Sequence, residues 1–205
     1  MSLPKLDYPI YNIEIPSTKV KNKFRPFLVK EEKLLLMAKE NNDSSEYLTS
    51  IKQVVNNCNL ENSFDIDKLT TFDLEFLFLK LRSLSVDNIV KLTYVDNEDK
   101  KTYNFDLNLN EVKVIFPENI DNNIKITDTA GIIMKYPSAS LYSDKEFLSL
   151  DKDYMFELII RCLDKIYDND TIYEIKNYSK KEIKLKVSKA IDRQLWQLNA
   201  KIYRN

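Results

Sequence analysis

The four residues Asp128-Thr129-Ala130-Gly131 place a carboxylate, a hydroxyl and a glycine directly after a predicted strand. A carboxylate-based catalytic loop of the Asp-Thr/Ser-Gly type, which aspartic proteases use, requires glycine immediately after the hydroxyl residue. Ala130 occupies that position in this chain. The sequence therefore favours an ordinary turn here and not a catalytic loop.

A second group of polar residues is acidic and offers the oxygen ligands that calcium prefers. The group consists of Asp164, Asp168, Asp170 and Glu174. The spacing and the glycine of an EF-hand loop are absent, so a solvated helix end explains these residues better than a metal site. Paired carboxylates can also serve a glycosidase. Because the chain has 32 acidic residues, such pairs carry no specificity, and a carboxylate-based hydrolase is the weakest functional alternative.

The residues that the chain lacks exclude most other chemistry. There is no histidine, which removes the Ser-His-Asp and Cys-His arrangements and the commonest metal ligand. Gly131 is the only glycine, so neither a P-loop nor a dinucleotide-binding turn can be built. Cys58 and Cys162 lack zinc-ligand spacing, and we interpret them as buried free thiols of a reducing compartment. We therefore predict a non-enzymatic protein with no catalytic residues, no metal and no cofactor.

Composition places the chain among ordinary globular proteins. It has 205 residues, 43% of them hydrophobic and 31% charged, with a formal net charge of -1. This balance argues against nucleic acid as the main partner. No apolar run reaches the roughly 20 residues that a membrane-spanning helix needs. The first ten residues lack the basic and apolar regions of a secretory signal, so we expect a cytoplasmic location.

Residues 70–85 form the element around which we expect the chain to pack. Their spacing predicts a helix, and Thr70 with Asp73 is typical of an N-terminal capping box. The helix has two apolar faces, one with Phe72, Phe76 and Leu79 and the other with Leu74, Leu77, Phe78, Leu81 and Leu84. A surface helix needs only one apolar stripe. Two alternatives follow: the helix is covered on both sides by its own domain, or one face is left for a partner protein.

The remaining patterns change from helical to alternating and back. Strands are predicted over residues 8–15, 20–28, 89–95, 102–109, 111–116, 123–127 and 132–136. Helices are predicted over residues 30–40, 47–58 and 155–166. A further helix is predicted to start near the capping pair Ser143 and Glu146. The last predicted helix starts at Ser179, which forms a capping pair with Glu182, and extends to residue 202.

These elements predict one α+β domain over residues 1–205. It would contain an N-terminal strand pair and helices (1–87), a central antiparallel β region (88–140) and C-terminal helices (141–205).

The C-terminal segment 180–205 is locally basic. An amphipathic helix with a basic solvated face explains it, whereas contact with an acidic partner, a membrane surface or nucleic acid is the functional alternative. Trp196, the only tryptophan, either anchors that helix or marks a contact point.

Several segments of the chain form recognisable motifs, and the most specific is RPFLVKEEKLLLMAKE, residues 25–40, preceded by Ile15-Pro16-Ser17. The further segments are residues 51–58, 73–83, 131–137, 166–168 and 178–182. Together these segments resemble the baseplate hub subunit and assembly protein family of T-even-like tailed phages. Some family members carry a cysteine pair in the hairpin where this chain has residues 93–97 without cysteine, and residues 188–205 do not align.

The resemblance implies a non-enzymatic protein that helps to assemble the central hub of a contractile tail by binding other hub proteins. The implied location is the host cytoplasm during assembly or the virion baseplate, and the alternative is a permanent structural subunit of the virion. We expect contacts through hydrophobic, aromatic and arginine anchors. The candidate contact residues are Arg25, Phe27, Phe72, Phe76, Leu79 and Trp196.

Overall fold

The computed structural model describes residues 7–41, 43–118, 121–150 and 154–185. The chain divides into two compact units, the first comprising Met1–Phe116 and Ser138–Ser149 and the second Pro117–Pro137 and Leu150–Asn205. The expectation of one domain with internal boundaries near residues 88 and 141 stays a prediction.

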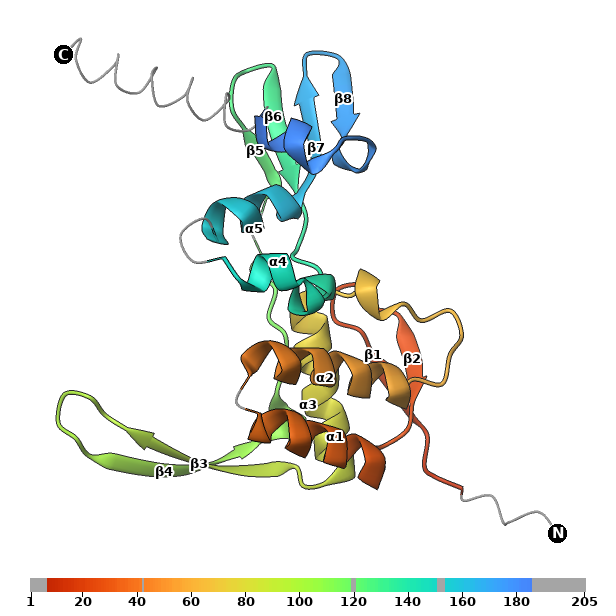
Figure 1. The fold of residues 1–205 in the computed structure, drawn as a ribbon, viewed down its shortest axis with the longest axis vertical. Coiled ribbons are helices and arrows are strands. Elements are labelled where there is room, and N and C mark those ends of the chain that lie inside the picture. Colours follow the sequence, from red (N-terminus) through yellow and green to blue (C-terminus); the bar gives the residue numbers. More distant parts are fainter. Residues whose placement is uncertain (1–6, 42, 119–120, 151–153, 186–205) are drawn as a thin grey trace. The chain divides into compact units, whose positions relative to one another are not determined.

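The first unit contains two β-hairpins and a group of helices (Figure 1). Its strands are β1 (Tyr11–Glu14), β2 (Lys21–Phe24), β3 (Ile89–Val95) and β4 (Thr102–Asn108). Its α-helices are α1 (Val29–Glu40), α2 (Ser44–Cys58), α3 (Thr71–Ser85) and α4 (Lys145–Leu148). Short 3-10 helices, η1 (Ile66–Lys68), η2 (Leu109–Glu111) and η3 (Ala139–Ser143), connect them.

The core of the first unit lies along one side of α3. Leu74, Leu77 and Leu81 are fully buried, as the spacing of three and four residues requires for one helix face. They belong to one apolar cluster with Val54 and Val55 of α2 and with buried side chains of the β1–β2 hairpin. Helix α3 is therefore a core helix on this side.

The second unit is built on a four-stranded antiparallel sheet in the order β5-β6-β7-β8. Its elements are β5 (Asn123–Lys125), β6 (Ala130–Met134), α5 (Tyr154–Cys162), β7 (Leu163–Asp168), β8 (Thr171–Glu174) and η4 (Ile175–Asn177), followed by a helix whose described part covers residues 180–185. Ile160, Leu163 and Ile183 form its buried core.

Gly131 of β6 has a packing role in this sheet. A Cβ atom at this position would lie 2.3 Å from the Tyr167 hydroxyl oxygen and 2.7 Å from the Ile124 carbonyl oxygen. Both distances are far inside van der Waals contact, so a larger residue would force β5 and the Tyr167 ring of β7 to move. Glycine is needed here because two neighbouring strands approach closely.

The α+β class is confirmed, and most elements lie where the sequence predicts them. Three predictions are wrong. Residues 112–116 do not form a strand. The helix predicted over 155–166 ends at Cys162, after which the chain continues as β7, and β8 was not predicted. The helix start near Ser143 is capped by Asp144, whose side chain accepts from the Phe147 N–H at 3.0 Å.

The early end of α5, at Cys162 and not at residue 166 as predicted, has a physical cause. Leu163 and Ile166 continue the helical spacing of the preceding residues, but Leu163 lies in the core of the second unit and Ile166 pairs with Ile132 of β6. Tertiary strand pairing therefore overrides the local pattern.

Candidate interaction surfaces

Asp73 fixes the start of α3 and thereby the position of its faces. Its side chain accepts hydrogen bonds from the Thr70 N–H at 3.3 Å and the Thr70 hydroxyl at 2.7 Å, completing the predicted capping box. The same carboxylate accepts from the Ser17 N–H at 2.9 Å and the Ser17 hydroxyl at 2.5 Å. Asp73 thus joins the β1–β2 turn to the helix, which its role as a cap alone does not predict.

The second apolar face of α3 is half-buried. Phe72, Phe76 and Leu79 are each partly exposed, in contrast to the fully buried leucines of the other face. The Phe72 ring meets the Phe116 ring edge-on at 5.7 Å between centroids. The Lys80 ammonium lies 5.3 Å from the centre of the Phe76 ring. This face is therefore partly covered by its own unit and partly open to solvent.

Arg25 is buried and belongs to the fold. Its guanidinium contacts Glu31 in two places, at 3.0 Å and 3.2 Å, and donates to the Asn57 carbonyl at 2.9 Å. Burial acts to lower the pKa of Arg25 and to raise that of Glu31, but hydrogen bonds and the attraction of nearby opposite charges together outweigh it, so the pKa of Arg25 is raised and that of Glu31 is lowered. All these contacts are internal, which leaves Arg25 little to offer a partner.

Both cysteines are free thiols, and both are buried. Burial raises the pKa of the Cys58 thiol to about 12, against the opposing charge of Arg25. Burial also raises the pKa of Cys162. Such thiols stay protonated at neutral pH and are poor nucleophiles.

Phe27 lies next to the buried pair but is itself half-buried. Its ring stacks on Phe78 of α3 at a centroid distance of 5.9 Å. Its backbone N–H donates to the Ser85 hydroxyl at 2.7 Å. Of the predicted contact residues Arg25 and Phe27, Phe27 is therefore the one with surface available for contact.

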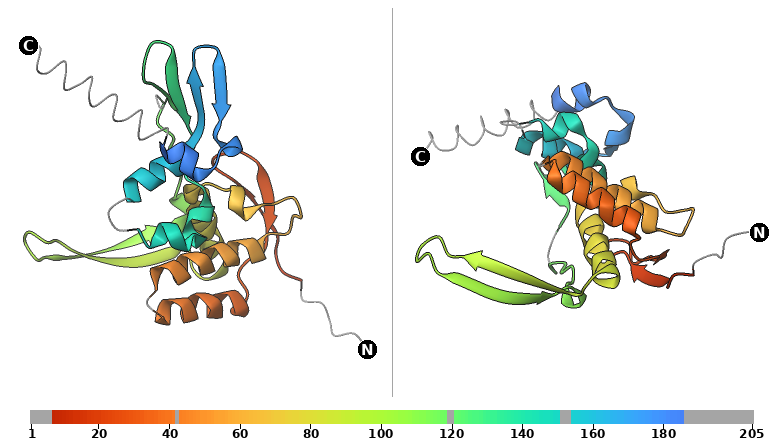
Figure 2. Two further views of the ribbon diagram at one scale, coloured as in Figure 1. Left: turned by 45° about the horizontal axis from the view of Figure 1, so that its top comes forward. Right: turned by 60° about the horizontal axis from the view of Figure 1, so that its bottom comes forward.

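The β3–β4 hairpin is the most exposed apolar element of the first unit, and it extends away from α1, α2 and α3 (Figures 1 and 2). Five of seven residues in β3 and six of seven in β4 are exposed, and none is buried. Its register pairs Val90 with Leu107, Leu92 with Phe105 and Tyr94 with Tyr103. Since directly opposed residues share a face, these six side chains form one continuous surface, which we call the apolar stripe.

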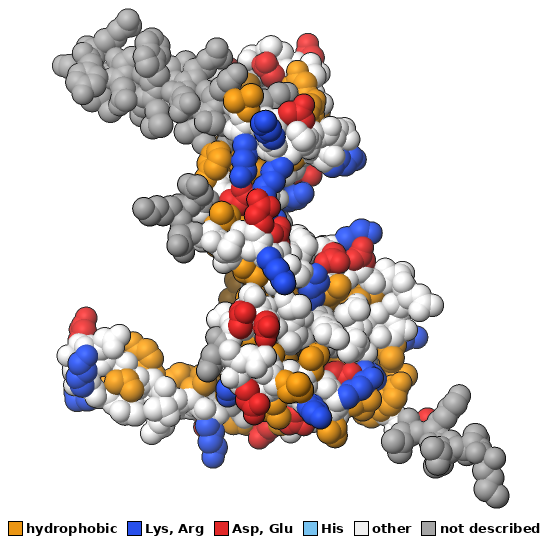
Figure 3. All heavy atoms as spheres, viewed as in Figure 1, with side chains coloured by type: hydrophobic (Ala, Val, Ile, Leu, Met, Phe, Trp, Pro, Cys, Tyr) orange, Lys and Arg blue, Asp and Glu red, His pale blue; other side chains and the backbone are white. Residues whose placement is uncertain are grey.

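The apolar stripe is open to solvent. The exposed fractions of its side chains other than Val90 range from 37% for Leu92 to 56% for Tyr94. Hydrophobic side chains are visible along this hairpin in Figure 3. The opposite face is mostly polar, with Thr93 donating to the Asn104 side chain at 2.8 Å. A ribbon that is apolar on one face is expected to pack that face against something.

The base of the hairpin is anchored firmly. Leu109, which follows β4, is buried, and its N–H donates to the Asn88 carbonyl at 2.7 Å. The Lys80 ammonium donates to the Leu109 carbonyl at 3.1 Å and the Asn110 carbonyl at 2.8 Å. Partial burial lowers the pKa of Lys80. Helix α3 therefore holds the hairpin at its base while the strands themselves stay exposed.

In the second unit, Glu157 of α5 is 2% exposed and gathers three cations. Its carboxylate contacts Arg161 at 3.0 Å, Lys180 at 2.7 Å and Lys184 at 2.5 Å. Burial acts to raise the pKa of Glu157, but these hydrogen bonds outweigh it and hold the pKa at about 2. The cluster attaches the helix that begins at residue 180 to α5.

That helix start follows the predicted pattern. The Glu182 side chain accepts from the Ser179 N–H at 2.9 Å and from the Ser179 hydroxyl at 2.6 Å. Trp196 and the rest of the predicted helix to residue 202 lie outside the described residues.

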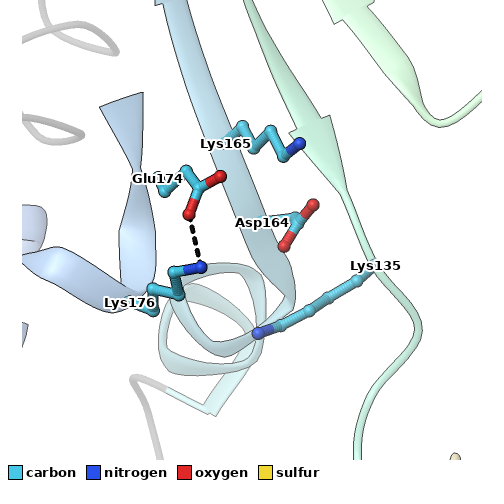
Figure 4. A pocket seen from close by; sticks show the side chains of 5 residues that line it. All are labelled: Lys135, Asp164, Lys165, Glu174 and Lys176. Atoms are coloured by element: carbon cyan, nitrogen blue, oxygen red, sulfur yellow. Dashed lines mark ion pairs between the residues drawn. The ribbon is translucent and has the colours of Figure 1, made fainter. Parts of the chain in front are cut away.

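A cavity of about 310 Å³ in the second unit contains two residues of the acidic group (Figure 4). Asp164 and Glu174 line it together with Lys135, Lys165 and Lys176, and Lys176 forms an ion pair with Glu174 at 2.6 Å. Three ammonium groups around two carboxylates disfavour calcium. Within the ranges that the structure describes, no three Cys, Asp or Glu side chains are grouped to hold a metal ion.

The Asp128-Thr129-Ala130-Gly131 segment lies at the turn from β5 to β6. The Thr127 hydroxyl accepts from the Ala130 N–H at 3.0 Å, and the Ile126 N–H donates to the Ala130 carbonyl at 2.9 Å. The predicted turn is therefore present. Among the described helices, none has the length and apolar character to cross a bilayer.

The apolar stripe is not among the contact surfaces predicted from the sequence. Its signal was present, because Val90, Leu92 and Tyr94 alternate with more polar residues. Such alternation normally indicates a half-buried strand. The pattern gives the apolar face but not whether another element of the chain covers it.

Comparison with known protein families gives a match over most of the chain. Residues 8–198 match the model of a family described as T4 bacteriophage base plate protein. No curated protein and no solved structure matches the chain.

Proposed function

Because the chain belongs to the family of T4 bacteriophage base plate proteins, we propose that it promotes assembly of the central hub of a contractile tail. It would act without catalysis, by binding other hub proteins. The family supports the broader statement, a structural role in a phage baseplate with contacts to other baseplate proteins. The observation that carries the narrower proposal is the exposed apolar stripe of the β3–β4 hairpin.

The stripe is suited to docking because strand pairing places its six side chains on one face of the hairpin. Completing the burial of six partly exposed side chains yields about 1 kcal/mol each, or about 6 kcal/mol in total. Association itself costs about 4–15 kcal/mol. The stripe alone therefore gives weak binding, and a stable complex requires a second contact.

The first unit has two sources for such a second contact. One is the backbone of the hairpin, whose outer strand edges can pair with a strand of a partner. The other is the half-buried group Phe72, Phe76 and Leu79, together with Phe27. In this proposal Arg25 supports the backbone next to Phe27 from inside, because its guanidinium donates to the Pro26 carbonyl.

Co-expression with the hub proteins of the same phage tests the proposal. The informative variant is Phe105→Asp, which places a charge on the apolar stripe. The control is Asn104→Asp, which adds the same charge one residue away on the opposite face and keeps an acceptor for the Thr93 hydroxyl. We expect Phe105→Asp to weaken capture of the hub partner at least tenfold and Asn104→Asp to leave it within about twofold.

Two results would count against the proposal. If the unmodified chain captures no hub protein, the hub role fails. If both variants bind as well as the unmodified chain, the hub role can stand but the stripe is not the contact. Circular dichroism on both variants checks that the fold is intact, which we expect because both positions are exposed.

A permanent structural subunit of the virion baseplate is the second candidate, supported by the description of the matching family. Quantitative mass spectrometry of purified particles separates the two. A fixed copy number in mature virions favours the structural subunit. Absence from virions, together with presence in the host cytoplasm during assembly, favours a transient assembly factor.

A further inference from the structure

A pocket of about 340 Å³ in the first unit shares no residue with the apolar stripe. Leu35 and Leu36 of α1 form one wall, and Phe78 and Arg82 of α3 form the other, with Val86 at the end of α3. Phe78, Arg82 and Val86 are spaced by four residues, so one side of α3 faces the pocket. The lining is thus apolar except near Arg82 and at two charged residues of α1.

Arg82 has an unsatisfied hydrogen-bonding group. Its Nη1 atom is buried and has no hydrogen-bond partner among the described residues. Buried polar groups in native proteins are nearly always paired, and an unpaired charged donor carries a free-energy cost. Arginine cannot relieve that cost by losing its proton. Since the residue as a whole is partly exposed and lines the pocket, rotation of its side chain would present the guanidinium to an acceptor placed there.

The charges around the pocket favour an anion. Arg82 and Lys39 are positive and Glu32 is negative, so the lining has an excess of one positive charge. No ion pair joins Glu32 to Arg82 within the described part of the chain. The guanidinium fork matches the two oxygens of a carboxylate.

We propose that this pocket binds a partner segment that presents an apolar side chain beside a carboxylate, the apolar group packing on Phe78, Leu35 and Leu36 and the carboxylate binding Arg82. The pocket does not depend on the hub-assembly proposal, because its ligand chemistry can be tested without any baseplate protein. Failure of one proposal therefore leaves the other in place.

Small probes isolate this chemistry. The ¹⁵N-labelled full-length chain is titrated with 3-phenylpropionate and, separately, with 3-phenylpropan-1-ol, which keeps the ring and replaces the carboxylate with a hydroxyl. An eleven-atom ligand is expected to bind with a Kd of a few mM, about 4 mM at typical ligand efficiency. The variants are Arg82→Gln and, as a control with the same change in charge, Lys33→Gln, because Lys33 is exposed and does not line the pocket.

We expect the carboxylate to bind about tenfold more tightly than the alcohol in the unmodified chain and in Lys33→Gln. Binding should change the backbone amide chemical shifts of Phe27 and Phe78. In Arg82→Gln the two probes should bind equally. Equal binding of both probes by the unmodified chain would mean that water satisfies Arg82, and it would overturn the inference. This comparison stands on its own if Arg82→Gln does not fold. A preference that persists in a folded Arg82→Gln would also overturn it.

Discussion

Replacing Glu31 with glutamine should strongly destabilise the first unit. Glu31 is almost completely buried, and its carboxylate contacts the Arg25 guanidinium at 3.0 Å and 3.2 Å and accepts from the Leu28 N–H at 2.9 Å. Glutamine keeps the shape but turns one acceptor into a donor. That donor faces the guanidinium in either orientation of the amide, and in one of them it also faces the Leu28 N–H. The Arg25 charge then stays buried without a counter-ion.

The expected magnitude follows from these contacts. Removing one partner of a buried ion pair costs about 3–5 kcal/mol. The remaining amide oxygen can still accept one bond, so we expect a loss near the lower end, about 3 kcal/mol. Domains are stable by only about 5–15 kcal/mol, so the effect will be a large shift of the unfolding midpoint.

The assay is urea unfolding at pH 7, followed by far-ultraviolet circular dichroism. The control is Glu32→Gln, which removes the neighbouring exposed carboxylate from the same helical turn and should cost less than about 1 kcal/mol. The double variant Arg25→Met with Glu31→Met removes both charges and should cost less than the sum of the two single methionine variants. Equal midpoints for Glu31→Gln and Glu32→Gln would refute the reasoning.

Three further outcomes are expected. Asp73→Asn should cost about 2 kcal/mol, since an amide nitrogen would face the donors of the capping box and of Ser17; an unchanged urea midpoint would contradict this. Gly131→Ala should lower the stability of the second unit by about 2 kcal/mol and perturb the Tyr167 ring, visible in its aromatic NMR signals; unshifted signals would speak against the close approach. The pKa of Glu157, about 2, lies below the ordinary value of 4.5, so its contribution to stability is complete above pH 4.5 and is lost as the pH falls towards 2. We expect the unfolding free energy to fall by about 2 kcal/mol over this pH range, measured through the pH dependence of the melting temperature. A Glu157→Gln variant with the same pH dependence would refute the assignment of this loss to Glu157.

Local signals in the sequence predicted much of the fold. The Thr70–Asp73 capping box, the Ser179–Glu182 helix start and the β3–β4 hairpin all depend on residues within a few positions of one another. Such short-range chemistry is visible in the order of the residues. Prediction from the sequence fails where contacts between distant segments determine the secondary structure. Residues after Cys162 continue the helical pattern of α5, but they form a strand because they pair with β6.

The candidate contacts show the same limit more strongly. Arg25 follows an aromatic residue in the sequence, a combination common at interfaces, yet Glu31 and the Asn57 carbonyl hold it inside. The two faces of α3 read as equally apolar, and only the packing of α2 and the N-terminal hairpin distinguishes the buried one from the half-buried one. Exposure depends on which segments meet in space, and no single segment encodes that.

The β3–β4 hairpin has a consequence for the order of events during tail construction. A lone two-stranded ribbon is marginally stable in water, and its unpaired edges invite further strands. In the free subunit its amide protons should therefore exchange quickly with solvent, while those of α3 are protected. In the docking that we propose, the ribbon becomes rigid only when a partner lies against it, and the last step of its folding then coincides with binding.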